Sequence, residues 1–149
     1  MKNTFLLSLG FLASTAAGAS CPDFSGKYYV GQIFEAVQSG CETLTLRLLP
    51  NTRPVFELKL DGSETPRAST PPWVEGAKWD GDALVFTSRY SDEYLSHVNI
   101  GNAVTTKKVY IFRLSGTGSI LFQYQTYGAR GQPTESARWY SSEFSRISE

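Results

Sequence analysis

The sequence predicts an all-β domain: an antiparallel up-and-down meander of about eight strands that closes into a small barrel. Short segments alternate between apolar and polar residues with a period of two, and turn-forming residues separate them at intervals of roughly 8 to 12 residues. No segment has the periodicity of a helix longer than two turns. Sequential hairpins favour a meander, and closure removes the edges of an open sheet. A β-sandwich is the alternative.

Length and composition favour one domain. A chain of 149 residues is long enough for one domain and too short for two of ordinary size. Hydrophobic residues make up 41% of the chain and are spread along it, so a core can form. Lys plus Arg and Asp plus Glu number 14 each, which gives no electrostatic signal for nucleic acid or an anionic membrane surface. We therefore expect a single domain over residues 20–149 and no nucleic-acid partner.

The first 19 residues have the pattern of a secretory signal peptide. Lys2 precedes an apolar run over residues 5–12, and small residues follow as far as Ala19. Cleavage after Ala19 would satisfy the preference for small residues at that position and at Ala17. No segment approaches the roughly 20 apolar residues of a transmembrane helix. We expect a periplasmic or secreted product without an integral membrane segment.

The two cysteines, Cys21 and Cys41, are predicted to form a disulfide, because an isolated pair in an oxidising compartment is usually bonded. The loop of roughly 20 residues would contribute about 3 kcal/mol. The alternative is that Cys21 is lipidated, as in bacterial lipoproteins. Against it, Gly18 stands where such signals normally carry an aliphatic residue. With one distant histidine, His97, the cysteines do not complete a zinc site, so no metal is expected.

The first strand is expected over residues 27–34, which are rich in aromatic and β-branched side chains, with a bulge or bend at Gly31. Residues 34–40 are expected to form a turn or a short irregular segment. Residues 41–49 then alternate cleanly, with leucines on one face, which predicts a half-buried strand.

A further strand is expected over residues 55–60, which alternate in the same way up to Asp61 and Gly62. Residues 63–72 are polar and contain three prolines. They are predicted to form a loop that could lie across an opening.

Two hairpins are expected in the second half. Residues 73–79 and 83–90 flank Asp80 and Gly81, a strong two-residue turn signal. Residues 91–106 are ambiguous, with elements of both a strand and a turn.

The clearest hairpin has arms at residues 108–114 and 120–127, joined by the Ser- and Gly-rich residues 115–119. A last strand is expected within residues 136–147.

The segment Phe24–Tyr29, reading FSGKYY, resembles the F-x-G-x-W-Y opening of the first strand in lipocalins and their calycin relatives. In that family the glycine allows close approach of the chain and the aromatic residue closes the barrel floor; here Tyr28 replaces the tryptophan. Residues 91–94 resemble the lipocalin T-D-Y segment, and Arg138 or Arg146 could be the late arginine that packs over the floor. There is no match to the family's C-terminal helix. The resemblance implies a cup that binds a small apolar molecule without catalysis.

Catalytic chemistry has little support in the sequence, and no cofactor is expected. His97 has no Ser-Gly or Cys nucleophile motif nearby. The acidic pairs at Asp80 and Asp82 and at Asp92 and Glu93 lie at predicted turns, where turn geometry explains them. The glycines of residues 116–118 precede no helix and so do not indicate a phosphate site. An enzyme would require His97, Asp92 and Glu93 to converge in a cleft.

Aromatic residues are the best candidates for ligand binding, because they can line an apolar pocket or stack on a ligand; they could equally form the core. Trp73, beside the Pro71–Pro72 loop, is the residue most expected to face a ligand or partner. The candidate ligand-binding residues are Trp73, Trp79, Tyr110, Phe112, Phe122 and Tyr124.

Two functions are compatible with these features. The first is an exported non-catalytic β-barrel that binds a small apolar or amphipathic ligand inside. The second is a periplasmic or extracellular interaction module, such as a hydrolase inhibitor, that acts through its loops and has a filled interior. The presence or absence of an internal cavity separates them.

Overall fold

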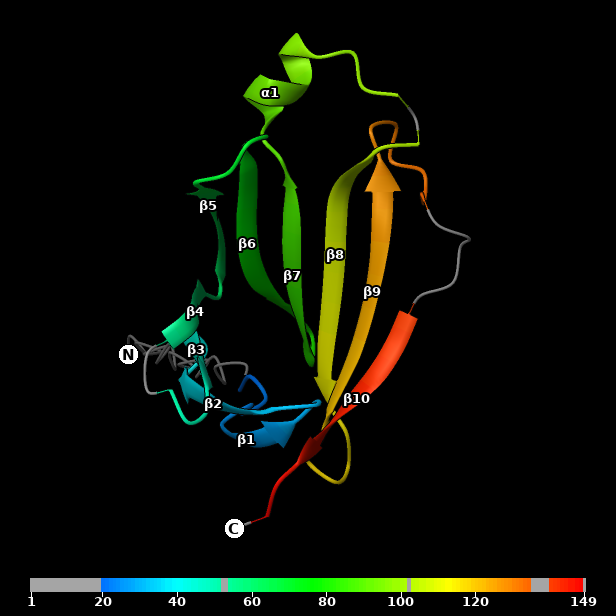
Figure 1. The fold of residues 1–149 in the computed structure, drawn as a ribbon. Coiled ribbons are helices and arrows are strands. Elements are labelled where there is room, and N and C mark those ends of the chain that lie inside the picture. The colour runs from blue at the N-terminus through cyan, green and yellow to red at the C-terminus, as the bar shows by residue number, and fades with distance from the viewer. Residues whose placement is uncertain (1–19, 52–53, 102, 135–139, 149) are drawn as a thin grey trace, which may run out of the picture.

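The computed structural model describes residues 20–51, 54–101, 103–134 and 140–148, which form ten strands and one short helix (Figure 1). All neighbouring strands are antiparallel, in the order β4-β3-β2-β1-β10-β9-β8-β7-β6-β5. The predicted antiparallel meander is confirmed as a nearly closed barrel. The elements are β1 (Gly26–Tyr29), β2 (Ile33–Ser39), β3 (Thr43–Leu48), β4 (Pro54–Lys59), β5 (Asp61–Arg67), β6 (Trp73–Asp80), β7 (Ala83–Tyr90), α1 (Asp92–His97), β8 (Thr105–Leu114), β9 (Ile120–Gly128) and β10 (Tyr140–Arg146).

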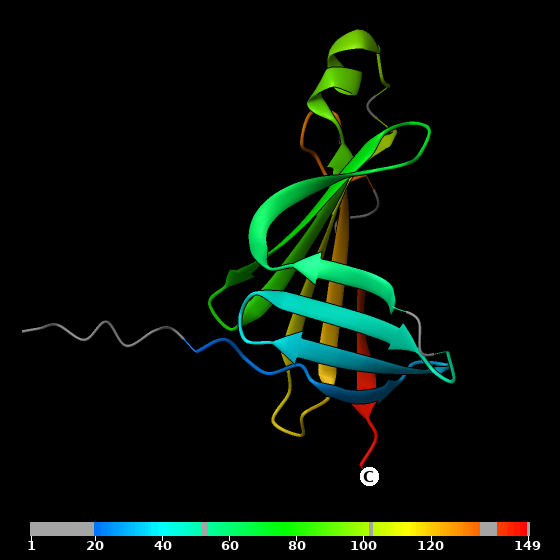
Figure 2. The ribbon, with the colours of Figure 1, turned by 90° about the vertical axis from the view of Figure 1, so that its left-hand side faces the viewer.

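The barrel consists of two layers whose strands cross. Strands β1 to β4 form one layer and β5 to β10 the other, and Figure 2 shows the first layer crossing in front of the second. Pairing of β1 with β10 joins the layers on one side, through Tyr28 opposite Arg146 and Tyr29 opposite Ser145. On the other side the chain passes between the layers at Leu60, which is 3% exposed. A buried bend of this kind is how orthogonally packed sheets turn a corner.

An open seam separates β4 from β5. The two strands follow one another in the chain, yet they are the two end strands of the sheet and do not pair with each other. The barrel is therefore closed covalently at Leu60 but not by a hydrogen-bonded ladder at this position.

Strand β2 occupies a segment that was predicted as a turn, so that prediction was wrong. The chain reverses earlier, within residues 30–32, where Gly31 has a φ of +78°. Residues 33–39 then pair with both β1 and β3. The inward-facing positions of β2 are Phe34, Ala36 and Gln38, and only the first has a large apolar side chain. The alternation was therefore too weak to see in the sequence.

Strand β5 occupies the first part of the predicted loop over residues 63–72. Asp61 and Gly62 form a bulge, in which the Asp61 carboxylate accepts a hydrogen bond from the Ser63 amide at 2.8 Å and Gly62 has a φ of +83°. The following residues pair with β6 through their backbone. Because β5 is an exposed edge strand, its side chains are polar and give no hydrophobic pattern.

The ambiguous segment contains the helix α1. The Ser91 side chain accepts a hydrogen bond from the Tyr94 amide at 3.2 Å and caps the helix, and Asp92 and Glu93 lie in its first turn. Acidic residues at this end are favourable because they interact with the helix dipole. The expected hairpins at Asp80–Gly81 and residues 115–119 are confirmed.

The core closes one end of the barrel. Tyr28 is fully buried, and its hydroxyl donates to the Phe24 carbonyl at 3.0 Å. The Arg146 Nη2 donates to the Ser25 carbonyl at 3.0 Å and lies so near Gly26 that a Cβ there would be 3.2 Å from it. Of the two candidate late arginines, Arg146 therefore lies against the start of β1, and Arg138 lies outside the described residues. The buried core residues are Phe24, Tyr28, Ala36, Leu44, Leu60, Ala77, Leu84 and Ile120.

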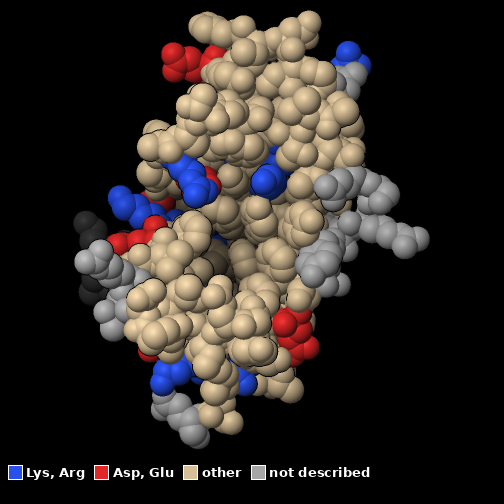
Figure 3. All heavy atoms as spheres, viewed as in Figure 1, with Lys and Arg blue, Asp and Glu red and all other residues tan. Residues whose placement is uncertain are grey.

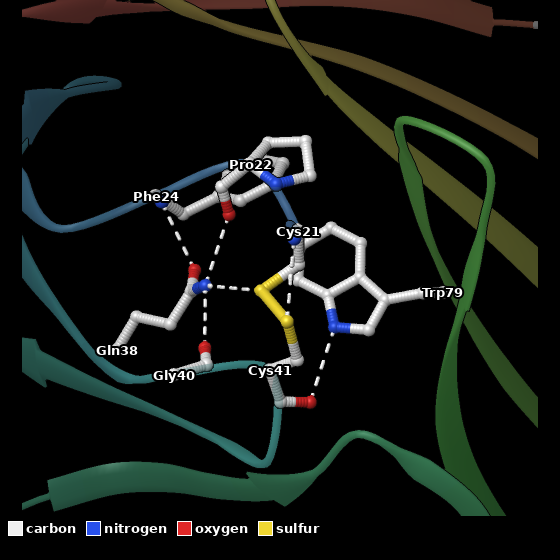
Figure 4. Close-up of a disulfide and its surroundings, with 7 residues drawn as sticks. All are labelled: Cys21, Pro22, Phe24, Gln38, Gly40, Cys41 and Trp79. Atoms are coloured by element: carbon white, nitrogen blue, oxygen red, sulfur yellow. Dashed lines mark hydrogen bonds between the residues drawn. A yellow bond between two sulfur atoms is a disulfide. The ribbon is translucent and has the colours of Figure 1, made fainter. Parts of the chain in front are cut away.

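The predicted disulfide between Cys21 and Cys41 is present, with a Cα–Cα distance of 5.6 Å (Figure 4). The Trp79 indole lies beside it and donates from Nε1 to the Cys41 carbonyl at 3.2 Å. Trp79 also packs on Phe24, with 5.7 Å between ring centroids. Because the Cys21 sulfur is bonded to Cys41, it is not free for a lipid. A disulfide is typical of an oxidising compartment.

The Gln38 side chain holds the segment after Cys21 against the turn before Cys41. Its Nε2 donates to the carbonyls of Pro22 at 2.9 Å and Gly40 at 2.7 Å, and its Oε1 accepts from the Phe24 amide at 3.0 Å (Figure 4). Gln38 therefore satisfies backbone groups that no strand pairs.

We expect the double variant Cys21→Ser, Cys41→Ser to lose about 3 kcal/mol in free energy of unfolding, because a loop with a sequence separation of 20 would no longer be closed in the unfolded chain. Urea unfolding monitored by tryptophan fluorescence measures the loss. Reductant should shift the wild type to the same midpoint and leave the double variant unchanged. An equal midpoint for oxidised wild type and variant would contradict the prediction.

Candidate ligand-binding cavity

A cavity of about 750 Å³ lies between the two layers. Leu46, Phe56 and Leu58 from β3 and β4 form one wall, and residues of β6 to β10 form the other. Figure 3 shows a hollow in this face of the molecule, with uncharged walls and basic side chains above it. The interior is therefore not filled by side chains alone.

A second chamber of about 270 Å³ extends toward the closed end. It shares wall residues with the first, and its remaining lining includes core residues such as Ala36, Leu84 and Ile120. The residues common to both chambers are Leu46, Phe56, Leu58, Phe112 and Phe144. The lining of the second chamber is apolar except for Gln32 and Arg47, so most of its surface suits apolar groups.

The strand register arranges the inner wall in rows. Glu75, Ser88 and Lys108 are paired across β6, β7 and β8 and form a polar row. Two residues further along each strand, Phe86 is paired with Tyr110, and two residues further still lies Phe112. Because side chains alternate between the faces of a strand, these rows face the same interior. The interior changes from charged to aromatic along the strand direction.

Aromatic rings line the wall below the polar row. Tyr110 stacks on Phe122 with 5.9 Å between centroids and on Tyr124 with 6.0 Å. Phe122 also packs on Phe112 at 5.3 Å and on Phe144 at 5.4 Å. Such a wall offers a large apolar area to a ligand at a low cost in side-chain entropy, because the rings already hold one another.

Charged side chains mark the other end of the cavity. The Arg67 Nη1 lies 3.0 Å from the Glu75 Oε1, and the Ser88 hydroxyl donates to the same oxygen at 3.3 Å. The Lys108 Nζ lies over the Trp73 ring, 5.5 Å from its centroid. All five residues line the cavity. A ligand can therefore meet both charge and hydrocarbon in one site.

Burial raises the pKa of the Tyr110 hydroxyl above its ordinary value of 10.0, and the neighbouring Tyr124 and Glu75 raise it further. The phenol therefore stays neutral in the folded protein at pH values where a solvated tyrosine ionises.

The structure brings four of the six predicted ligand-binding residues to the cavity: Trp73, Tyr110, Phe112 and Phe122. Tyr124 lies beside them in the ring stack. Trp79 lies at the closed end, against the disulfide. Contact between any of these residues and a ligand stays a prediction.

The charged members of the site were missed in the sequence. Lys108 and Glu75 lie in segments predicted only as strands, and Arg67 lies in the predicted loop. A signal was present, because Lys108 is in phase with Tyr110 and Phe112, and Glu75 is in phase with Trp73. A charged residue on the apolar face of a strand indicates either an ion pair or a polar part of a cavity.

The residues considered for catalysis lie on the exposed helix α1. His97 is exposed, and its Nδ1 lies 3.0 Å from the Ser96 hydroxyl. Asp92 forms an ion pair with Arg89 at 2.6 Å, and Glu93 is exposed. The hydrogen bonds that the Arg89 guanidinium donates to Glu64 and Asp92 raise its pKa. His97, Asp92 and Glu93 do not line either chamber.

In the described part of the chain, no group of three or more His, Cys, Asp or Glu residues lies close enough together to hold a metal ion. Among the same residues, no helix has the length and apolar character needed to cross a membrane.

Comparison with known proteins adds no relative: no protein-family model matches the chain, and no curated protein matches it significantly. The fold and the cavity are therefore the features of this protein that bear on its function.

We expect Tyr110→Phe to reduce the loss of stability at alkaline pH. The raised pKa of Tyr110 means that the unfolded chain releases this proton first, so its contribution to stability is full below pH 10.0 and is lost as the pH rises through the folded pKa. Chemical unfolding over a pH series above 10.0 should show a shallower decline in the variant.

Tyr29→Phe is the control, since this tyrosine lies on the outer face of β1 and is 53% exposed. Its stability should follow the wild-type curve. Parallel curves for wild type and Tyr110→Phe would contradict the prediction.

Proposed function

We propose that this protein is an exported, non-catalytic β-barrel that binds a small amphipathic ligand in its interior. The observation that carries the proposal is the cavity of about 750 Å³, whose walls are apolar except at one charged end. Pockets for small molecules typically measure about 300 to 1,000 Å³ and combine apolar walls with a few polar groups that fix the ligand's orientation. An amphipathic molecule fits such a site better than a purely apolar one, which would partly desolvate the Lys108 ammonium without supplying a hydrogen-bond acceptor.

The resemblance of residues 24–29 to lipocalins supports a binding role. Tyr28 is buried at the floor, and Arg146, one of the two arginines that the resemblance offers for packing there, lies against Gly26 of the same segment. In lipocalins the open end of the cup receives the ligand, and here the end opposite the floor carries the charged side chains.

Export is supported by two independent features. The disulfide between Cys21 and Cys41 is stable in an oxidising compartment, and the segment before it has the order of residues found in signal peptides. We infer that the mature protein acts in the periplasm or outside the cell.

The alternative function is an interaction module that acts through its loops. That alternative assumes an interior filled with side chains, and the cavity of about 750 Å³ does not support this assumption. Trp73, the residue proposed to contact a protein partner, lines the cavity and packs edge-on against Tyr90 at 4.5 Å between centroids.

We expect Ser88→Phe to weaken binding of the neutral fluorescent hydrophobe phenylnaphthylamine by at least about tenfold, because a buried phenyl ring would occupy space that the probe needs. Ser88 is 7% exposed and lines the cavity. A fluorescence titration measures the affinity, and thermal unfolding by circular dichroism verifies that the variant is folded.

Thr87→Phe is the matched control, since its side chain lies on the opposite face of β7, in an outer groove with Val85 and Arg89. It should bind the probe like the wild type. Equal binding by a folded Ser88→Phe variant, or no saturable binding by the wild type, would overturn the proposed function.

A further inference from the structure

We propose that the ligand is an anionic amphiphile, a single-chain alkyl carboxylate, whose head group binds Lys108 and whose tail lies along the aromatic wall. This inference rests on the proposed function and adds the sign of the ligand's charge and its direction in the cavity. It is carried by the distribution of charge at the polar end of the site.

Three charged side chains line the cavity, and two of them neutralise each other. Arg67 and Glu75 form an ion pair at 3.0 Å. Among the described residues Lys108 forms no ion pair, and its ammonium group lies over the Trp73 ring. The lining therefore carries one net positive charge, and it lies on Lys108.

Glu75 is not placed to neutralise Lys108. Strand β7 separates the two residues, with Ser88 paired to both. Adjacent strands are about 4.8 Å apart, so the backbones of Glu75 and Lys108 are separated by about 10 Å. The Ser88 hydroxyl donates to Glu75 rather than bridging toward the lysine, and Arg67 binds Glu75 from β5. The Glu75 carboxylate is therefore bound by Ser88 and Arg67 and not by Lys108.

The surroundings of Lys108 favour an anion. The side chain is half-buried, and the Trp73 ring holds its ammonium group at the edge of the cavity. A ring face attracts the cation but supplies no hydrogen-bond acceptor oxygen, so the ammonium remains able to donate to a ligand. A carboxylate would provide charge-assisted hydrogen bonds, an alcohol only neutral ones, and a cation would be repelled.

The length of the wall matches a medium-length alkyl tail. From Lys108 to Phe112 the strand advances four residues, about 13 Å at roughly 3.3 Å per residue. Along this distance the lining changes from Lys108 to Tyr110, Phe122 and Phe144, and the apolar second chamber follows. A head group at Lys108 therefore directs its tail toward the closed end.

Displacement of phenylnaphthylamine tests the charge. Dodecanoate, dodecanol and dodecyltrimethylammonium share one tail and differ in the head group, and each is used below its micelle-forming concentration. We expect dodecanoate to bind about tenfold or more tightly than dodecanol, since a hydrogen bond to a charged group contributes more than a neutral one. The cationic amphiphile should bind most weakly.

Lys108→Met tests the assignment to this residue, because methionine keeps the length and apolar character of the side chain but removes its charge. The preference for dodecanoate over dodecanol should fall by about tenfold. Lys107→Met is the matched control: Lys107 lies on the outer face of β8, with its ammonium 5.8 Å from the centroid of the Tyr127 ring, and its loss should leave the preference intact.

The possible failures are distinguishable. Equal displacement by the acid and the alcohol, or a preference that survives in Lys108→Met, would overturn the anionic-ligand proposal while probe binding blocked by Ser88→Phe upholds the proposed function. Absence of any saturable probe binding to the wild type would overturn both.

Discussion

The rest of the structure depends on the pairing of β1 with β10. It is where the two layers of the barrel are joined by strand pairing, and it involves two residue pairs, Tyr28 with Arg146 and Tyr29 with Ser145. Further contacts reinforce this short joint: the Arg146 side chain donates to the Ser25 carbonyl, and the Ile147 amide donates to the Lys27 carbonyl at 2.9 Å. This pairing fixes the position of β1, whose buried Tyr28 closes one end of the barrel. It also holds β3 and β4 opposite β7 and β8, at the separation that leaves a cavity between them.

The two ends of the interior perform different tasks. At the closed end, Phe24 packs against Trp79, and Tyr28 packs against Phe34. The disulfide and the hydrogen bond from the Phe24 amide to Gln38 fix the chain segment that precedes β1. Burial of these aromatic side chains supplies hydrophobic stabilisation. Toward the other end, the same inward-facing rows line the cavity of about 750 Å³ instead of filling the interior. The packed core and the cavity are therefore separated along the length of the strands.

Much of the fold could be predicted because alternation and turn residues are local properties. Two identical dipeptides show the limit of predicting the fold from local sequence. Asp80–Gly81 forms a hairpin turn, whereas Asp61–Gly62 forms a bulge after the buried corner at Leu60. The difference is set by which strands lie nearby, and the dipeptide carries no information about that.

The cavity could be predicted only in part. Alternation places Tyr110, Phe112 and Lys108 on one face of a strand, but it does not give the distance to the opposite layer. Whether Trp79 fills the closed end or lines the hollow depends on the position of Cys41, 38 residues away in the chain. Non-local packing of this kind decides which aromatic residues form core and which remain available to a ligand.

The unpaired edges of β4 and β5 have a mechanical consequence. Elsewhere in the barrel, expansion would require breaking cross-strand hydrogen bonds, whereas these two edges share none. They also cannot drift apart, since Leu60 connects them directly and is anchored by the hydrogen bond from its amide to the Glu42 carbonyl at 2.8 Å. The two strands are thus connected at one end and unpaired beyond it, so the barrel can widen at this position without loss of a backbone hydrogen bond between β4 and β5.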